Sequence, residues 1–105
     1  MTAEALCLAL TMATQSFGPL PAENLELACS QAEHLIQASE EYGFEPTLMA
    51  GLIYIESRWT ADAVSRAGAC GLTQVIPRYV EETCNELKNP TTSITRRVLV
   101  PCRSG

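Results

Sequence analysis

The sequence contains few of the residues that bind metals or nucleic acids. It has a single histidine, and its five cysteines form no CxxC pair, so the spacing typical of zinc sites is absent. Lysine and arginine number 7 against 12 aspartates and glutamates, for a net charge of −5, and only Arg96 and Arg97 are adjacent. Phosphate binding needs clustered basic side chains. We therefore expect no metal, no cofactor and no nucleic-acid partner.

The sequence also lacks a long apolar run. None approaches the ~20 residues that a helix needs to cross a bilayer, so we expect no membrane span. The apolar start, "MTAEALCLALTMATQS", resembles a signal peptide in length, but it carries Glu4 and no Lys or Arg. An amphipathic helix in this N-terminal segment, 1–22, is the favoured interpretation, and an export signal stays open as the alternative.

The cysteines leave the cellular compartment undecided. In an exported chain, one or two disulfides would form among the five cysteines, whereas in a reducing cytoplasm the same side chains would be small buried apolar groups. The five are Cys7, Cys29, Cys70, Cys84 and Cys102.

The length and composition indicate one small folded domain of mainly α structure. The chain has 105 residues, of which 47% are hydrophobic. Apolar residues at helical spacing predict a helix that ends near Gly43, and His34 falls on its polar side with no assigned role. Residues with helical spacing on the apolar side are Leu25, Ala28, Ala32, Leu35, Ile36 and Ser39.

Two more helices and three regions complete the predicted organisation. Pro46 and Pro77 each suit the first turn of a helix, and "NPTTS" is expected to end the second of these. We divide the chain into the N-terminal segment, a domain over 23–94 and an irregular tail over 95–105.

The helix that begins at Pro46 ends in a carboxyl group beside an apolar stripe. Leu48, Leu52 and Ile55 form the stripe, and Glu56 is expected at the edge of the buried face. Partial desolvation disfavours the charged form of a carboxyl group and raises its pKa, which suits a general acid that protonates a glycosidic oxygen. The alternative is a helix-end carboxylate that simply reaches solvent, and helix position alone does not decide between the two.

The loop after this helix is rich in small residues and carries a recognisable signature. Gly68 and Gly71 within 60–76 permit backbone with positive φ and close approach of another chain segment or a ligand, so we expect a shaped loop or a short irregular β hairpin here. The stretch "ESRWTADAVSRAGACGLTQVIP" resembles the signature of the lytic transglycosylase family, the SLT domains related to goose-type lysozyme. The matching residues are Glu56, Ser57, Ala63, Val64, Ser65, Gly68, Ala69, Gly71, Leu72, Gln74 and Pro77.

This resemblance implies a lysozyme-like helical domain that cleaves the β-1,4 bond between N-acetylmuramic acid and N-acetylglucosamine in peptidoglycan. Glu56 would be the single catalytic acid and base, the substrate's acetamido group would stabilise the anomeric centre, and a 1,6-anhydro ring would form. Asp62 is the nearest alternative partner and is favoured as a turn residue.

The resemblance also implies which residues contact the glycan. Gln74 matches a substrate-contacting amide, while Ser57 and Ser65 match positions that border the site, with helix or turn capping as the alternative for both. Thr73 stands where the family most often has Met, and we place it on the substrate wall. The expected substrate-binding residues are Ser57, Ser65, Gly71, Leu72, Thr73 and Gln74.

The resemblance covers about 25–94 and is strong over 48–77. Family members continue into helices with an Ala-Tyr-Asn-type motif that this sequence lacks, so we expect only the first lobe of the groove. One hypothesis is a peptidoglycan lytic transglycosylase, or a hydrolysing lysozyme on the same scaffold, that is periplasmic, extracellular or phage-associated. The other is a weak or inactive fragment that binds glycan or a protein. A protein partner that completes the groove is also possible.

Overall fold

The computed structural model describes residues 1–99, and within them the chain is helical. The elements are α1 (Ala3–Phe17), α2 (Ala22–Tyr42), α3 (Pro46–Ser57), the 3₁₀-helix η1 (Pro77–Tyr79), α4 (Cys84–Leu87) and α5 (Pro90–Leu99). No strand occurs in this part of the chain, and the loop between α3 and η1 contains two isolated β-bridges. The predicted mainly α class is confirmed.

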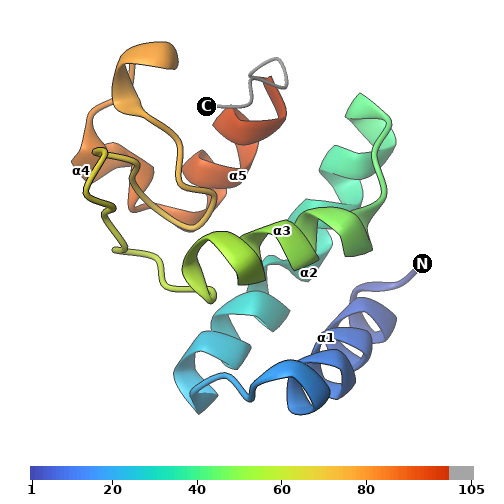
Figure 1. Cartoon of the computed structure of the whole chain (residues 1–105). Helices are drawn as coiled ribbons and strands as arrows, with labels where there is room; N and C mark the ends of the chain where they lie inside the picture. The colour runs from blue at the N-terminus through green and yellow to red at the C-terminus, as the bar shows by residue number, and fades with distance from the viewer. Residues whose placement is uncertain (100–105) are drawn as a thin grey trace.

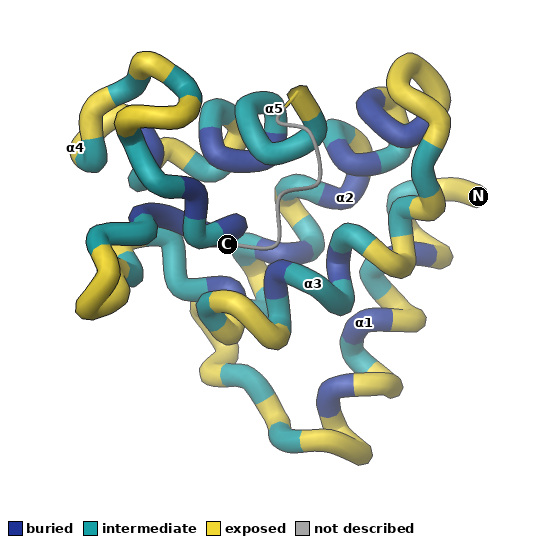
Figure 2. The backbone as a smooth tube through the Cα atoms, turned by 45° about the horizontal axis from the view of Figure 1, so that its top comes forward, coloured by how far each residue is buried: buried dark blue, intermediate teal, exposed yellow. Residues whose placement is uncertain are grey.

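Helix α2 is the centre of the packing. It contacts α1, α3 and α5, and α4 packs against α5. Figure 1 shows α1 on one side of α3, and α4 with α5 on the other side. The side of α2 predicted to be apolar is confirmed, because Ala28, Ala32, Leu35 and Ser39 are buried. Figure 2 shows the buried residues where the helices face one another and exposed residues at the tips of the connections.

The N-terminal segment forms a helix that is integrated into the core. The Thr2 hydroxyl accepts a hydrogen bond from the Ala5 amide at 3.1 Å and thereby caps α1. Leu6 and Leu10 of this helix belong to the main hydrophobic cluster. A disulfide between Cys7 and Cys29 joins α1 to α2.

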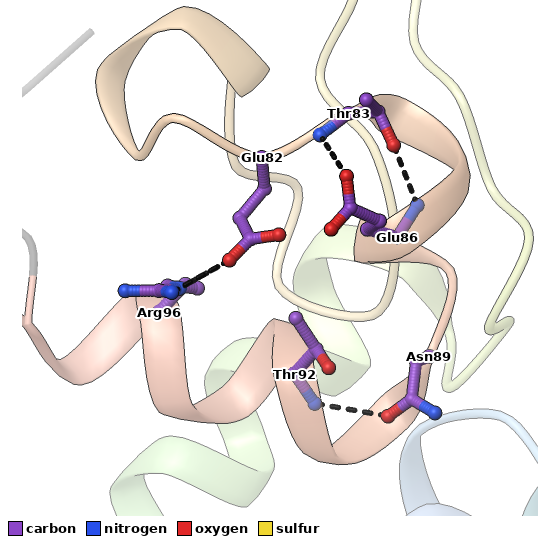
Figure 3. Close-up of polar contacts among 6 residues, drawn as sticks. All are labelled: Glu82, Thr83, Glu86, Asn89, Thr92 and Arg96. Carbon is purple, nitrogen blue, oxygen red and sulfur yellow. Dashed lines mark hydrogen bonds and ion pairs between the residues drawn. The ribbon is translucent and has the colours of Figure 1, made fainter.

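The prediction of a single helix from Pro77 to the "NPTTS" stretch is wrong. The chain makes only the 3₁₀ turn η1 before Glu81 adopts a left-handed conformation with φ of 56°. Helix α4 then begins anew after Thr83. The Thr83 hydroxyl accepts from the Glu86 amide at 3.1 Å, and the Glu86 carboxylate accepts from the Thr83 amide at 3.1 Å (Figure 3).

The prediction of an irregular tail from residue 95 is wrong for 95–99, which belong to helix α5. The "NPTTS" stretch, predicted to end a helix, begins this one. Pro90 is the first residue of α5, a position where its missing amide hydrogen costs nothing. The Asn89 side chain accepts a hydrogen bond from the Thr92 amide at 3.0 Å, and Arg96 forms an ion pair with Glu82 (Figure 3). Cys102 and the rest of the expected tail lie outside the described residues.

His34 is not on an open solvent face. Its side chain is half-buried between α2 and α5, where Nε2 lies 3.2 Å from the Thr95 hydroxyl.

Candidate active site

Glu56 is the penultimate residue of α3, and its side chain is exposed. The prediction that this carboxyl group is partly buried is therefore wrong in the part of the chain that the structure describes. The reason is the orientation of α3, which turns Ala50 and Ile53 into the core. The predicted apolar stripe lies on another side of the helix, since Leu48 is 72% and Ile55 is 76% exposed.

The exposed side of α3 borders a groove instead of the core. An apolar groove of about 350 Å³ lies between α1 and α3. Ile55, the residue before Glu56, lines it together with Tyr54 and Phe17. Of the predicted stripe, Ile55 therefore lies at this groove and not in the core.

Ser57 ties the end of α3 to the glycine-containing loop. Its hydroxyl donates a hydrogen bond to the Leu72 carbonyl oxygen at 2.7 Å and lies 3.2 Å from the Ile53 carbonyl oxygen. The side chain is half-buried. The residue directly after Glu56 therefore connects the helix to the loop through a side-chain to backbone contact.

The loop between α3 and η1 folds back on itself as an irregular hairpin. Val64 pairs with Cys70, and Cys70 pairs with Val75, in isolated antiparallel bridges. Ser65 lies in the exposed outer turn, where its hydroxyl accepts from the Ala69 amide at 3.1 Å. The expected short irregular β or loop segment is thus present, and Ser65 makes the turn-capping contact that was its alternative role.

Gln74 uses its side-chain amide to hold the same loop. Nε2 donates to the carbonyl oxygens of Gly71 at 2.8 Å and Ala63 at 3.1 Å. The backbone of Gln74 is left-handed, with φ of 52°, and the residue is half-buried. These two bonds use both amide hydrogens for the loop itself, and the side-chain carbonyl oxygen is the group with a remaining capacity to bind a ligand.

Gly71, Leu72 and Thr73 lie in the interior of the part of the chain that the structure describes. All three are buried, with Leu72 in the main core cluster, which contradicts their expected contact with substrate. Gly71 has φ of 83°, and a Cβ atom here would overlap the Leu87 carbonyl group. The glycine is therefore required because α4 ends against the loop backbone.

Thr73 forms a buried polar contact with α5. Its hydroxyl lies 2.7 Å from the Ser93 hydroxyl and donates to the Ser93 carbonyl oxygen at 3.0 Å. The Thr73 amide donates to the Ser93 hydroxyl at 3.1 Å. Thr73 therefore serves the interior, whereas the sequence analysis placed it on the substrate wall.

Two disulfides hold the elements around this site. Cys70 of the loop pairs with Cys84 at the start of α4, in addition to the pair between α1 and α2. The sequence left disulfides and buried thiols open, and the structure pairs four of the five cysteines.

Within residues 1–99, no group of three or more His, Cys, Asp or Glu side chains is arranged to hold a metal ion. No helix in the same range is long and apolar enough to cross a membrane.

Sequence reasoning missed the residues that shape the chain directly after Ser57. Arg58 and Trp59 have φ of 53° and 56°, two consecutive left-handed residues with side chains other than glycine. Their conformation has no sequence signal, because left-handed backbone is normally marked by Gly, Asn or Asp. Asn24 of α2, whose amide donates to the Arg58 carbonyl oxygen at 3.0 Å, was also missed, because a backbone oxygen as a partner leaves no mark in the sequence.

Comparisons with known proteins agree on one family. The model of the family described as the transglycosylase SLT domain matches residues 33–100. The chain is 40% identical over 58 residues to the membrane-bound lytic murein transglycosylase C of Actinobacillus pleuropneumoniae serotype 5b (strain L20), an alignment of 54% of this chain and 16% of that protein. It is 38% identical over 61 residues to the protein of the same name from Glaesserella parasuis serovar 5 (strain SH0165), covering 57% and 17% of the two chains.

These alignments set the scope of the comparison. They span 16% and 17% of the length of the two relatives. No solved structure matches the chain significantly.

Proposed function

The chain belongs to the transglycosylase SLT domain family, and we propose that it cleaves the β-1,4 bond between N-acetylmuramic acid and N-acetylglucosamine in peptidoglycan. The observation that carries this proposal is the placement of Glu56. Its carboxyl group is exposed at the end of α3, and the next residue binds the loop that contains the rest of the family signature. A rigid helix end is a suitable support for an acid and base that must meet a polymeric substrate.

Glu56 acts twice in the proposed reaction. As the acid, its carboxyl group gives a proton to the glycosidic oxygen while the acetamido oxygen of the muramic acid bonds to the anomeric carbon. The bond to the leaving N-acetylglucosamine breaks in the same step. As the base, the Glu56 carboxylate takes the proton of the C6 hydroxyl, whose oxygen then attacks the anomeric carbon and displaces the acetamido oxygen. The 1,6-anhydro ring forms, and Glu56 is protonated again.

The proposal uses a single carboxyl group, that of Glu56. Retaining glycosidases of the two-carboxylate type hold their acid and nucleophile about 5 to 5.5 Å apart, and substrate-assisted enzymes are the exception to this rule. Asp62, the alternative partner considered from the sequence, is exposed in the loop. The acetamido group of the substrate takes the place of a second carboxylate in this proposal.

The proposed location follows from the cysteines. Disulfides form and persist in oxidising compartments, so the two cross-links support a periplasmic, extracellular or phage-associated protein. Peptidoglycan is accessible in these locations.

A second candidate function is supported by the exposure of Glu56. A carboxyl group open to solvent gains little from the low dielectric that strengthens catalysis. On this alternative the chain is a glycan-binding or protein-binding module with weak or no activity, or a subunit whose groove a partner protein completes.

Digestion of purified peptidoglycan tests the proposal, with released muropeptides identified by mass. We expect anhydro-muropeptides from the parent protein and none from Glu56→Gln. The matched control is Glu45→Gln, which makes the same change at the exposed residue before the other end of α3 and should retain activity.

The other outcomes separate the alternatives. Products with reducing ends in place of anhydro ends would identify a hydrolysing lysozyme. No release by a parent that circular dichroism shows to be folded would favour the binding module, which sedimentation with insoluble peptidoglycan would then detect. Substantial turnover by Glu56→Gln would refute the role of Glu56.

A further inference from the structure

The connection between α1 and α2 is bonded to the end of α3. The Tyr54 hydroxyl donates to the Gly18 carbonyl oxygen at 2.9 Å, and Arg58 Nη1 donates to the Tyr54 hydroxyl oxygen at 2.9 Å. The Arg58 guanidinium carbon also lies 4.6 Å from the centroid of the Tyr54 ring, within the range of a cation–π contact. The Tyr54 hydroxyl thus connects the Arg58 guanidinium to the Gly18 carbonyl group.

The absence of a side chain on Gly18 allows this contact. Its φ is 156°, and a Cβ atom on it would lie 2.9 Å from the Tyr54 hydroxyl oxygen and 3.0 Å from Arg58 Nη1. These separations are shorter than an ordinary carbon contact, so a side chain here would displace both groups. The close approach depends on glycine at the end of α1.

The backbone of Arg58 is also held by α2. The Asn24 side chain donates to the Arg58 carbonyl oxygen at 3.0 Å and to the Thr60 hydroxyl at 3.3 Å. Arg58 and Trp59 are both left-handed, a conformation that persists in residues other than glycine only when surrounding contacts enforce it. Trp59 is fully buried in the main core, so the chain is fixed on both sides of this turn.

Glu56 lies in the middle of the segment that these contacts fix. Tyr54, two residues before it, bonds to Gly18, and Arg58, two residues after it, bonds to the Tyr54 hydroxyl. We propose that Tyr54 and Arg58 are positioning residues that hold the end of α3, and with it the backbone that carries Glu56, against the connection between α1 and α2. This inference rests on the proposed function. Gly18 and Asn24 precede the region matched by the family model, so the anchor is supplied from outside the matched domain.

Tyr54→Phe tests the inference, because it keeps the ring and removes the one hydroxyl group that takes part in both hydrogen bonds. The matched control is Tyr42→Phe at the exposed end of α2. A small displacement of a catalytic group can cost up to about a hundredfold in rate. We expect kcat for peptidoglycan cleavage to fall roughly tenfold in Tyr54→Phe with KM within about twofold of the parent.

Amide hydrogen exchange provides a readout that does not depend on catalysis. The Arg58 amide donates to the Tyr54 carbonyl oxygen at 3.0 Å, and the Thr60 amide donates to that of Ser57 at 3.1 Å. We expect exchange at both amides to accelerate in Tyr54→Phe and to stay unchanged in Tyr42→Phe, because local opening is set by local contacts.

The outcomes distinguish this inference from the proposed function. If the parent is active and Tyr54→Phe matches it in kcat and in exchange, the positioning role is refuted while the function stands. If kcat falls only in proportion to the folded fraction, measured by circular dichroism at the assay temperature, the contacts are merely structural and the inference fails. If the folded parent releases no muropeptide, the function fails and the positioning role falls with it, whatever the exchange rates show.

Discussion

The hydroxyl of Ser57 lies 2.7 Å from the carbonyl oxygen of Leu72 and donates a hydrogen bond to it. The contact bridges 15 positions of sequence and joins the residue after Glu56 to a fully buried part of the loop. The two halves of the family signature, Glu-Ser and the glycine-containing loop, are therefore connected directly.

Ser57→Ala should destabilise the protein and lower its activity. The Leu72 carbonyl group would lose its donor inside the core, and an unsatisfied buried acceptor costs about 1 to 3 kcal/mol. We expect the free energy of unfolding in urea to fall by about this amount and the cleavage rate to fall as well.

Ser30→Ala is the control for this prediction. Its hydroxyl bonds to the Leu27 carbonyl oxygen at 2.7 Å, but the residue is exposed on α2. Water can replace that bond, so stability should change by less than about 0.5 kcal/mol. Equal effects of the two substitutions would contradict a specific role for the Ser57 contact.

Gly71→Ala should be strongly destabilising. The new Cβ atom would overlap the Leu87 carbonyl group, and alanine at φ of 83° is strained in addition. We expect a loss of about 3 kcal/mol or more in urea unfolding.

Gly51→Ala provides a comparison within the same chain. Gly51 lies in α3, and a Cβ atom there has open space around it. Replacement of a helical glycine by alanine commonly gains about 0.5 to 1 kcal/mol. A stable Gly71→Ala protein would mean that α4 does not end against the loop as described.

The two disulfides should differ in their effect on activity. Each closes a short loop, with sequence separations of 22 and 14, so removal of either should cost about 2 to 4 kcal/mol. The Cys70–Cys84 pair also fixes the hairpin that Ser57 contacts. Replacement of that pair by serine should therefore lower cleavage activity at a temperature where the protein is folded, whereas replacement of Cys7 and Cys29 should lower only the melting temperature.

Thiol titration of the unfolded, unreduced protein checks the pairing itself. With four cysteines paired, at most one of the five should react. Three or more reactive thiols, or a melting temperature unaffected by a reductant, would contradict the cross-links.

Glu86 should make stability depend on pH in the acid range. Hydrogen bonds from Thr83 hold the pKa of its carboxyl group below the ordinary value of 4.5, and the Arg96 charge acts in the same direction (Figure 3). A carboxyl group with a lowered pKa contributes stability that is present above its unfolded pKa and is lost as pH falls through the folded value.

Thermal melts of Glu86→Gln across pH measure this contribution. We expect the variant to melt below the parent at neutral pH and the difference to shrink as pH falls below about 4.5. Glu26→Gln, an exposed change on α2, should leave the pH profile unchanged. A difference between Glu86→Gln and the parent that grows toward acid pH would refute the assignment.

The sequence predicted the helices whose apolar residues share one side. In α2, periodicity and Gly43 defined both the buried side and the end of the helix. In α3, apolar residues occur on several sides of the helix, so periodicity did not select the buried one, and the stripe of Leu48 and Ile55 was placed wrongly. The error at Glu56 followed from that error.

The segment between η1 and α5 was mispredicted because its signals have two meanings. Pro77 can begin an α-helix or a 3₁₀ turn, and Asn89 followed by Pro90 can end one helix or begin another. In the candidate site, the resemblance to the family signature selected Glu56 and the loop as candidates. It could not identify the contacts of Ser57 and Gln74, since their partners are backbone oxygens with no mark in the sequence.

The buried hydroxyl pair of Thr73 and Ser93 has a consequence for how α5 is seated. Only Ser93 and Ile94 of this helix are buried, so apolar packing alone specifies its rotation weakly. A rotation of α5 about its axis by one residue would leave the buried hydroxyl and amide groups of Thr73 without hydrogen-bond partners. We infer that this pair contributes more to the uniqueness of the folded arrangement than to its free energy, because it penalises every other rotational setting of the helix.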